Sequence, residues 1–236
     1  MQKINLDKSI IRIGVMGDTH IGSIYTPKQN ILKAFEEFDK AKVDFMVHTG
    51  DVTEGMSNRP DHVYQLTHVG YDKMKTYAIE LLSKCPCPAF YIDGNHDQWF
   101  IKSNGSLIVK DICNEIPDAT FLGHGEGDIK LNNIIIKLWH GEDGNSITTS
   151  YRMQKVIETL TQIEKFDIIC MGHTHKQAYI YERGKHAIST GSIQRMSNWM
   201  KGKRMIAHVG FHIIEVVLNT KGIESLSVKW TPLKSC

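Results

Sequence analysis

Histidine, aspartate and asparagine are gathered in five short motifs whose side chains could bind metal ions. The motifs are Gly17-Asp18-Thr19-His20, Gly50-Asp51, Gly94-Asn95-His96-Asp97, His140-Gly141 and Gly172-His173-Thr174-His175. Imidazole nitrogen combined with carboxylate oxygen suits Mn, Fe or Zn better than Ca or Mg. The motifs offer no thiolate, which argues against a purely structural zinc site. Each motif is weak by itself, but their combination indicates a metal centre.

The spacing within the motifs suggests how two ions could be held. Asp18 and His20 are two residues apart, as are His173 and His175, so on an extended loop each pair would point toward one ion. A lone carboxylate such as Asp51 could bridge two ions about 3.5–4 Å apart. Two divalent cations would leave an excess of positive charge over Asp18 and Asp51, which one hydroxide and one phosphodiester anion would match.

An α/β framework is predicted to bring these motifs together. Buried strands are expected at Ile10–Met16, Val43–His48, Ala89–Ile92, Ile134–Trp139 and Ile168–Met171. Helical patterns lie between the strands, one beginning with Thr26 as N-cap and Pro27 at the first helical position, and others across roughly 61–83, 104–115 and 148–165. Each strand runs into one motif. Because the carboxyl ends of parallel strands lie side by side, the motifs should converge.

The pattern becomes β-rich after about residue 177. Strands are expected at Gln177–Tyr181, His186–Ser189, Met205–Val217 and Glu224–Trp230. No linker-like stretch separates the two parts of the chain. We therefore expect residues 1–236 to form a single domain that contains two sheets.

The five motifs, in this order and at these strand ends, resemble those of the calcineurin-like metallophosphoesterases. The resemblance covers roughly residues 10–192, and no motif is missing. It implies an α/β fold of two packed mixed β-sheets flanked by helices. It also implies two divalent metal ions, with Mn²⁺ as the first choice and Fe, Zn or Ni as alternatives. The implied ligands are Asp18, His20 and His175 for one ion, Asn95, His140 and His173 for the other, and Asp51 as the bridge.

Catalytic roles follow from the same resemblance. His96 corresponds to the catalytic histidine of the family, which faces the substrate and is not a ligand, and Asp97 would orient its ring. The implied reaction is hydrolysis of a phosphoester by attack of a metal-bridging hydroxide. His96 would protonate the leaving oxygen or stabilise its developing charge.

Several substrate classes remain open. The run from Gly17 to Ser23 is similar to the first motif of the DNA-repair exonucleases of the family, which favours a nuclease or phosphodiesterase. Those proteins carry additional DNA-capping or partner domains that a chain of 236 residues lacks, so a small-nucleotide phosphodiesterase or pyrophosphatase is the alternative. A phosphomonoesterase or protein phosphatase is less favoured, because the segment from Gly50 to Gly55 has no Arg to clamp a dianionic phosphate. An inactive scaffold is disfavoured, because no ligand is lost.

One basic and aromatic segment could contact DNA or RNA. It contains Arg195, Trp199, Lys201, Lys203 and Arg204, soon after the last motif. Cations would pair with phosphates and the indole would stack on a base, although an ordinary charged surface loop has the same composition. The polar stretch 54–71, with His62 and His68, is also expected to overhang the site.

The composition limits the other classes. With 28 Lys and Arg against 26 Asp and Glu, the net charge of +2 gives no general attraction to nucleic acid or anionic membranes. The sequence predicts no signal peptide, membrane span or membrane partner, and it leaves the oligomeric state open. We interpret the cysteines as free thiols of a cytoplasmic protein; they are Cys85, Cys87, Cys113, Cys170 and Cys236.

Overall fold

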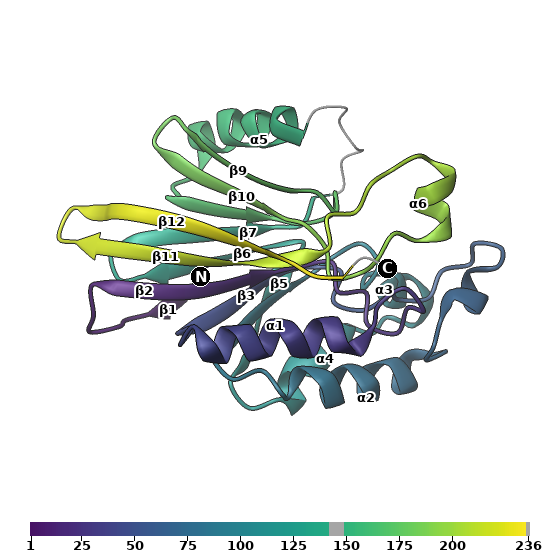
Figure 1. The fold of residues 1–236 in the computed structure, drawn as a ribbon. Helices are drawn as coiled ribbons and strands as arrows, with labels where there is room; N and C mark the ends of the chain where they lie inside the picture. The colour runs from purple at the N-terminus through teal and green to yellow at the C-terminus, as the bar shows by residue number, and fades with distance from the viewer. Residues whose placement is uncertain (142–148, 235–236) are drawn as a thin grey trace.

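Two six-stranded β-sheets pack against each other in the computed structural model, which describes residues 1–141 and 149–234 (Figure 1). The β7 sheet has the order β1 (Gln2–Ile4), β6 (Glu126–Leu131), β7 (Ile134–Trp139), β8 (Ile168–Met171), β10 (Lys185–Thr190) and β9 (Gln177–Glu182). The β2 sheet has the order β12 (Gly222–Pro232), β11 (Gly210–Asn219), β2 (Ile10–Met16), β3 (Phe45–Thr49), β4 (Ala89–Asp93) and β5 (Ala119–His124). Both sheets are mixed. Strands β2 to β5 run parallel, as do β7, β8 and β10, whereas β11, β12 and β9 pair antiparallel.

Helices cover the outer faces of both sheets (Figure 1). The β2 sheet is covered by α1 (Lys28–Lys40), α2 (Tyr71–Leu82) and α4 (Ile108–Glu115), and the β7 sheet by α5 (Thr149–Ile163). Their apolar residues recur at helical spacing, so one face of each helix turns inward; in α1 that face contains Ile31, Phe35 and Phe38. Two short helices, α3 (Trp99–Asn104) and α6 (Asn198–Gly202), lie at the end where the chemistry-bearing loops gather.

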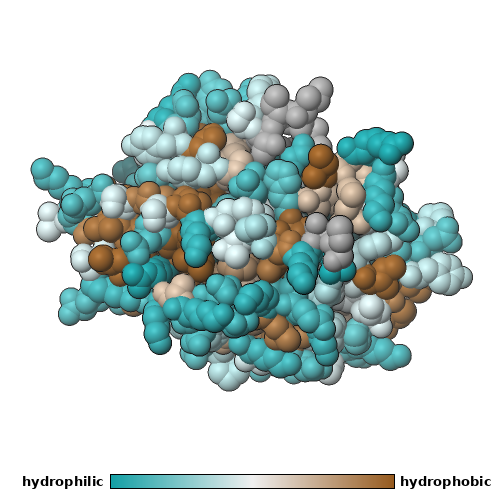
Figure 2. All heavy atoms as spheres, in the orientation of Figure 1, coloured by the Kyte–Doolittle hydropathy of each residue, from teal (hydrophilic) through white to brown (hydrophobic). Residues whose placement is uncertain are grey.

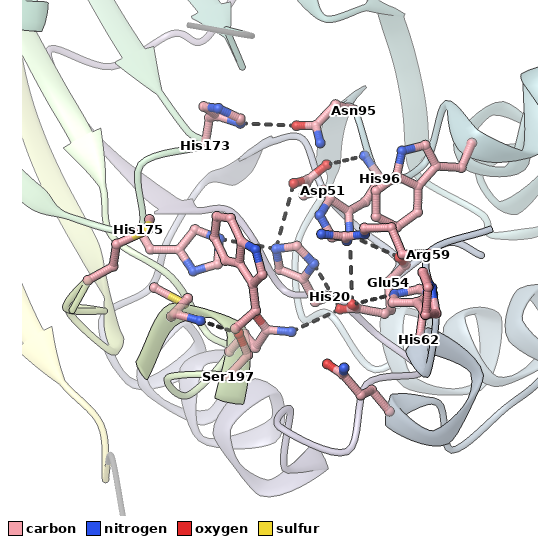
Figure 3. Close-up of a pocket in the computed structure, with 17 residues that line it drawn as sticks. His20, Asp51, Glu54, Arg59, His62, Asn95, His96, His173, His175 and Ser197 are labelled. Carbon is pink, nitrogen blue, oxygen red and sulfur yellow. Dashed lines mark hydrogen bonds and ion pairs between the residues drawn. The ribbon is translucent and has the colours of Figure 1, made fainter. Parts of the chain in front are cut away.

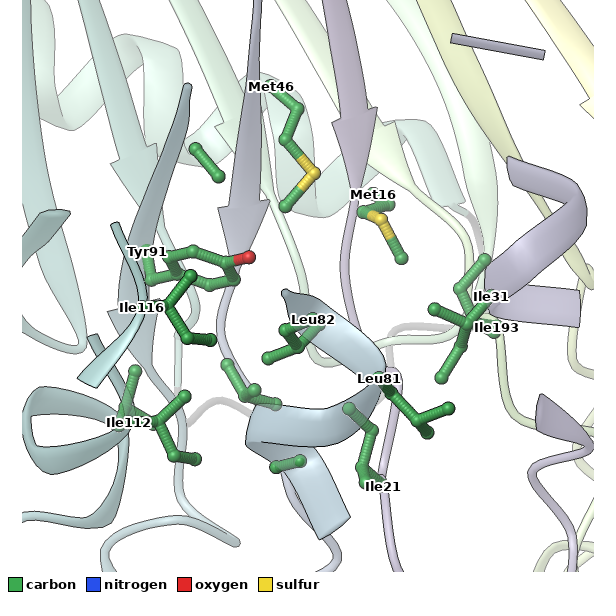
Figure 4. Packing of buried hydrophobic residues seen from close by; sticks show 14 of the residues in the cluster. Met16, Ile21, Ile31, Met46, Leu81, Leu82, Tyr91, Ile112, Ile116 and Ile193 are labelled. Atoms are coloured by element: carbon green, nitrogen blue, oxygen red, sulfur yellow. The ribbon is translucent and has the colours of Figure 1, made fainter. Parts of the chain in front are cut away.

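Hydrophobic side chains fill the spaces between these layers. Ile13, Val47 and Ile92 of the β2 sheet meet Ile136 and Ile168 of the β7 sheet in the core between the sheets. A second core lies between the β2 sheet and its helices (Figure 4). Burial of a large aliphatic side chain contributes about 1.5–3 kcal/mol. Burial on both faces is the reason that the strands appear in the sequence as continuous apolar runs.

The surface that Figure 2 shows is mainly hydrophilic, with hydrophobic atoms in scattered groups. Within the described ranges, no helix is long and apolar enough to span a bilayer.

The predicted elements agree with the structure except at several boundaries. The strands Ile10–Met16, Ile134–Trp139 and Ile168–Met171 have the predicted limits. The helix expected across 61–83 is instead a short 3₁₀ helix at His62–Gln65 followed by α2, because Gly70 between them has a φ of 93° that no helix contains. The helix expected across 104–115 begins only at Ile108, as α4, and the separate helix α3 precedes it at Trp99–Asn104.

Two further predicted boundaries were wrong. Pro27, not Thr26, is the N-cap of α1, and no side chain caps this helix, because the Thr26 hydroxyl makes no hydrogen bond. The strand predicted from Met205 begins only at Gly210, after α6 and a loop.

Candidate metal centre

The loops after five parallel strands meet at one end of the two sheets and bring all seven predicted metal ligands together. Three of these strands belong to the β2 sheet and two to the β7 sheet, so the site lies across the boundary between the sheets. Strand β2 leads to Asp18 and His20, β3 to Asp51, β4 to Asn95, β7 to His140, and β8 to His173 and His175. Figure 3 shows several of these side chains pointing toward a common centre.

One group of donor atoms consists of Asp18, His20 and His175. Nε2 of His175 lies 3.4 Å from Oδ1 of Asp18 and 3.2 Å from Nε2 of His20. Asp18 is fully buried, and its two carboxylate oxygens accept the backbone N–H of His173 at 3.0 and 3.1 Å. This contact fixes the loop after β2 against the loop after β8.

A second group consists of Asn95, His140 and His173. Oδ1 of Asn95 lies 3.0 Å from Nε2 of His140 and 3.0 Å from Nδ1 of His173. Nδ1 of His140 donates to the carbonyl of Thr49 at 2.8 Å, which leaves Nε2 as the ring nitrogen available to a ligand. The ring is therefore oriented toward the centre of the group.

Asp51 lies between the two groups. Its Oδ2 is 3.6 Å from Nε2 of His20 and 3.3 Å from Nε2 of His140, so a single carboxylate oxygen faces both groups. Its Oδ1 accepts the backbone N–H of His96 at 2.8 Å. This is the placement that a bridging carboxylate requires.

The residues fit divalent cations. Ligand atoms at about 2.1 Å from one ion lie about 3 Å from each other, and the donor atoms within each group have that spacing. The imidazole nitrogens and the amide and carboxylate oxygens that face one another this closely form a concentrated donor set. Imidazole, amide and carboxylate donors together suit Mn, Fe or Zn.

The pKa values of two proposed ligands, Asp18 and His140, show that the site favours bound positive charge. Burial raises the pKa of Asp18 to about 7. Burial would lower the pKa of His140, but the nearby charges of Asp51 and Asp18 raise it to about 9. These groups would share protons at neutral pH, and bound cations would replace those protons.

The backbone of the proposed ligands is unusual. Five of them have positive φ angles: Asp18 (50°), His20 (45°), Asp51 (49°), His173 (74°) and His175 (55°). This left-handed region is sparsely populated by residues other than glycine, and such residues cluster at functional sites. The sequence analysis expected extended loops, but these residues have left-handed backbone conformations. Asp18 and His20 belong to one donor group, as expected, whereas His173 and His175 face different groups.

His96 lies beside the metal ligands, but Asp97 does not orient its ring. Nδ1 of His96 donates to the carbonyl of Glu54 at 3.0 Å, and its ring packs against Trp99 with 4.0 Å between centroids and 34° between the ring planes. The Asp97 carboxylate is buried and instead accepts the backbone N–H groups of Val52, Thr53 and Gly94. The expected Asp97–His96 contact is thus corrected, because backbone donors occupy both oxygens of Asp97.

Sequence reasoning missed Glu54, Trp99 and Gln194. Glu54 is buried, with Oε2 at 3.1 Å from Nδ1 of His20 and Oε1 at 3.1 Å from Nε2 of His62. Gln194 donates to Glu54 at 2.9 Å. Only the position of Glu54, three residues after Asp51 at the start of the polar stretch, could have indicated it.

A cavity of about 280 Å³ opens onto the two donor groups. His20, Asp51 and His96 line the cavity next to the donor groups. Arg59, Trp99 and Trp199 line it as well. The Arg59 guanidinium lies over the Trp99 ring, 4.9 Å from its centroid. Figure 3 shows Arg59, His62 and Ser197 around the same space.

The basic and aromatic segment reaches this cavity through its aromatic residue. Trp199, at the second position of α6, is half exposed and lines the cavity. Lys201, Lys203 and Arg204 are exposed and lie outside the lining, and the half-buried Arg195 donates its backbone N–H to Tyr25.

Of the other histidines, His62 lines the cavity, and Nε2 of His48 lies 3.0 Å from the hydroxyl of Thr19, between Asp18 and His20. His68 stacks on Tyr77, and His212 packs on Trp230. Cys85, Cys87, Cys113 and Cys170 are free thiols, and Cys236 lies outside the described residues.

Comparisons with known proteins agree with this geometry. A family model described as calcineurin-like phosphoesterase matches residues 11–177. No curated protein matches the chain. A solved structure of an archaeal phosphodiesterase is similar with a TM-score of 0.54 and 18% identity, covering 94% of this chain and 100% of that one.

Two other solved structures have the same fold. Vacuolar protein sorting 29 from Cryptosporidium parvum is similar with a TM-score of 0.52 and 15% identity, over 96% of this chain and 100% of its own. The phosphoesterase YfcE from E. coli is similar with a TM-score of 0.50 and 14% identity, over 92% and 98%. At these identities the likeness extends to the fold alone, and it confirms two mixed sheets flanked by helices.

Proposed function

Since the chain belongs to the calcineurin-like phosphoesterases, we propose that it hydrolyses phosphodiester bonds with the help of two divalent metal ions. The observation that carries this proposal is the position of Asp51, whose single oxygen Oδ2 faces both donor groups. A structural metal site would have no need of two groups that share one carboxylate beside an open cavity.

The proposed ligands divide as the two donor groups do. Asp18, His20 and His175 would hold one ion, Asn95, His140 and His173 the other, and Asp51 would contact both. Ions bound there would supply Lewis acidity toward phosphoryl oxygens and lower the pKa of an attacking water. Mn²⁺ is the first choice for both positions, with Fe, Zn or Ni as alternatives.

His96 is the proposed general acid. Its Nδ1–H donates to a carbonyl, so Nε2 is the nitrogen left to contact a substrate oxygen, and the ring lines the cavity. The tilted contact with Trp99 restricts rotation of the ring. A proton delivered from this position would assist departure of the leaving oxygen.

The charge around the cavity supports a diester over a monoester. The buried carboxylate of Glu54 lines the cavity and lies in the segment from Gly50 to Gly55, which has no Arg. The arginine of the lining, Arg59, lies over the Trp99 ring. A phosphate monoester carries more negative charge than a diester, and a carboxylate beside the site repels it more strongly.

Nuclease activity on DNA or RNA is the finer part of the proposal. Trp199 lines the cavity with half of its surface exposed, and it lies in the same segment as the exposed Lys201, Lys203 and Arg204. An aromatic platform beside cations is a common arrangement for single-stranded nucleic acid. Hydrolysis of a small nucleotide diester or pyrophosphate is the second candidate, favoured by a cavity of only about 280 Å³.

Two assays with Mn²⁺-loaded protein test the proposal. Bis-p-nitrophenyl phosphate should be hydrolysed and p-nitrophenyl phosphate should not, with Asp51→Asn as the inactive control. Preference for the monoester would overturn the diesterase assignment. Labelled single- and double-stranded DNA and RNA then decide between the two candidates: cleavage supports a nuclease, and no cleavage under any of the metals leaves the small nucleotide diester.

A further inference from the structure

Glu54 connects three segments that are far apart in the sequence. Its side chain is buried, at 5% exposure, and its neighbours come from the loop after β2, from the 3₁₀ helix His62–Gln65 and from the segment after β10. Oε1 lies 3.1 Å from Nε2 of His62. Oε2 lies 3.1 Å from Nδ1 of His20 and 2.9 Å from Nε2 of Gln194. Figure 3 shows His20 and His62 beside Glu54.

The hydrogen bonds around Glu54 determine where the protons lie. Nδ1 of His62 accepts the backbone N–H of Ser57 at 3.3 Å, so Nε2 of His62 must carry the proton that it shares with Glu54. The side-chain amide of Gln194 donates as well. A carboxylate that already receives two donors presents an acceptor to His20, which favours the proton on Nδ1 of that ring.

This protonation leaves the opposite nitrogen of His20 free to bind a metal. Nε2 of His20 is the atom that faces His175 and Asp51. A histidine ligand commonly donates its second ring N–H to a carboxylate, which fixes both the tautomer and the orientation of the ring. Glu54 is of the right type and its Oε2 lies 3.1 Å from Nδ1 of His20 as an ion pair, in an alignment that is not that of a regular hydrogen bond.

The main chain of the same segment contacts His96. The carbonyl of Glu54 accepts Nδ1–H of His96 at 3.0 Å. The next residue, Gly55, approaches so closely that an added Cβ would lie 2.1 Å from the carbonyl oxygen of His96. The segment therefore contacts a proposed metal ligand through a side chain and the proposed general acid through its backbone.

A third cation among His20, Glu54 and His96 is the competing interpretation, because donor atoms of the three lie within 4.8 Å of one another. The contacts oppose it. Glu54 is occupied by Gln194 and His62, and Nδ1 of His96 by a carbonyl. An ion would have to displace these partners, whereas the positioning role uses every one of them.

We propose that Glu54 is the positioning residue for His20, holding the Nδ1–H form of the ring so that Nε2 faces the metal centre. The proposal rests on the proposed function only for its metal-affinity and activity readouts. Gln at position 54 has the same shape but a single acceptor oxygen and an NH₂ group. Glu54→Gln therefore leaves at least one of the surrounding donors opposite another donor.

The decisive experiment measures Mn²⁺ binding to chelator-treated protein by titration calorimetry. In the wild type we expect two ions per chain. In Glu54→Gln the affinity of one site should fall about 10–100-fold and the other should be unchanged. His62→Phe is the matched control, because it keeps a ring at this position and removes the donor to Glu54 without touching His20. Its affinities should stay within about threefold of the wild type. Diester turnover of Glu54→Gln should recover at saturating Mn²⁺.

Histidine-ring NMR separates this proposal from the proposed function. The metal-free wild type should show a slowly exchanging Nδ1–H signal, assigned to His20 by its loss in His20→Gln and absent in Glu54→Gln. Its absence from the wild type would overturn the positioning role even if metal binds. Wild-type affinity at both sites of Glu54→Gln, or a third ion that only the wild type binds, would also overturn it. A wild type that binds no Mn²⁺ but retains the signal would overturn the proposed function instead.

Discussion

Oδ1 of Asp97 accepts hydrogen bonds from both the backbone N–H and the hydroxyl of Thr53, at 2.7 and 2.8 Å. The other oxygen accepts the backbone N–H groups of Val52 and Gly94, at 2.9 and 3.0 Å. Asp97 thereby joins the loop that carries Asp51 to the loop that carries Asn95. Its contribution is to the shape of the metal centre, not to the His96 ring.

Asp97→Asn should lower the free energy of unfolding by about 2–4 kcal/mol, because an amide would leave buried backbone donors without an acceptor. Urea denaturation of the chelator-treated protein measures this change. Full stability combined with a large loss of diester turnover would contradict it and would return Asp97 to a role in catalysis.

His96→Asn should retain both metal ions and lose turnover. The ring lines the cavity, and no ligand atom of the two donor groups depends on it, so Mn²⁺ stoichiometry should not change. Turnover on bis-p-nitrophenyl phosphate should fall roughly 10²–10⁴-fold, the usual effect of removing a general acid. Loss of both ions in this variant would contradict the separation of roles.

Metal binding should stabilise the folded protein. Mn²⁺ at about one hundred times its dissociation constant should add about 2.7 kcal/mol per site, since the unfolded chain holds no preformed site. Thermal denaturation with and without chelator measures the gain. In Asp51→Asn the gain should shrink strongly because both donor groups lose the shared oxygen. An equal gain in the variant would exclude Asp51 as a bridge.

Acidification should destabilise the protein through His212, a buried residue of β11. Burial lowers the pKa of His212 from 6.5 to about 4, while Nε2 donates to the carbonyl of Ser189. Between pH 6.5 and about pH 4, His212 is protonated in the unfolded chain but not in the folded protein. The free energy of unfolding therefore decreases as the pH is lowered through this range. The cost at pH 5 is about 2 kcal/mol.

Urea denaturation at pH 7.5 and pH 5 tests this effect. His212→Gln keeps a donor for Ser189 but does not titrate, so its stability should change about 2 kcal/mol less between the two pH values than that of the wild type. His68→Gln, outside the core, is the control and should follow the wild type. An unchanged pH dependence in His212→Gln would show that other groups dominate.

The sequence predicted the parts of the fold that depend on local burial. Ile134–Trp139 and Ile168–Met171 are buried on both faces, so their apolar runs mark the strands directly. Helix boundaries were harder to predict. Gly70 interrupts a pattern that otherwise continues from residue 61 to 83, and a single backbone angle leaves no trace in hydrophobic periodicity.

At the site, the seven ligands that the sequence predicts lie together in the structure, and each stands in a short motif after a strand; that they bind metal stays a prediction. The sequence could not locate Glu54 or Trp99, whose roles depend on contacts between distant segments. The same limit explains the error at Asp97. Adjacency to His96 suggested a contact, but the Asp97 side chain accepts the backbone N–H groups of Val52, Thr53 and Gly94 instead.

The left-handed backbone of the proposed ligands has a consequence for how this chain would respond to selection for heat resistance. Each such residue costs about 1 kcal/mol or more relative to glycine. Glycine at position 173 or 175 would relax the loop and raise the melting temperature of the metal-free protein while it removed a ligand. Screens that reward thermostability alone would therefore enrich variants that have lost a proposed metal ligand and, with it, activity. Evolved variants should be selected with metal and substrate present.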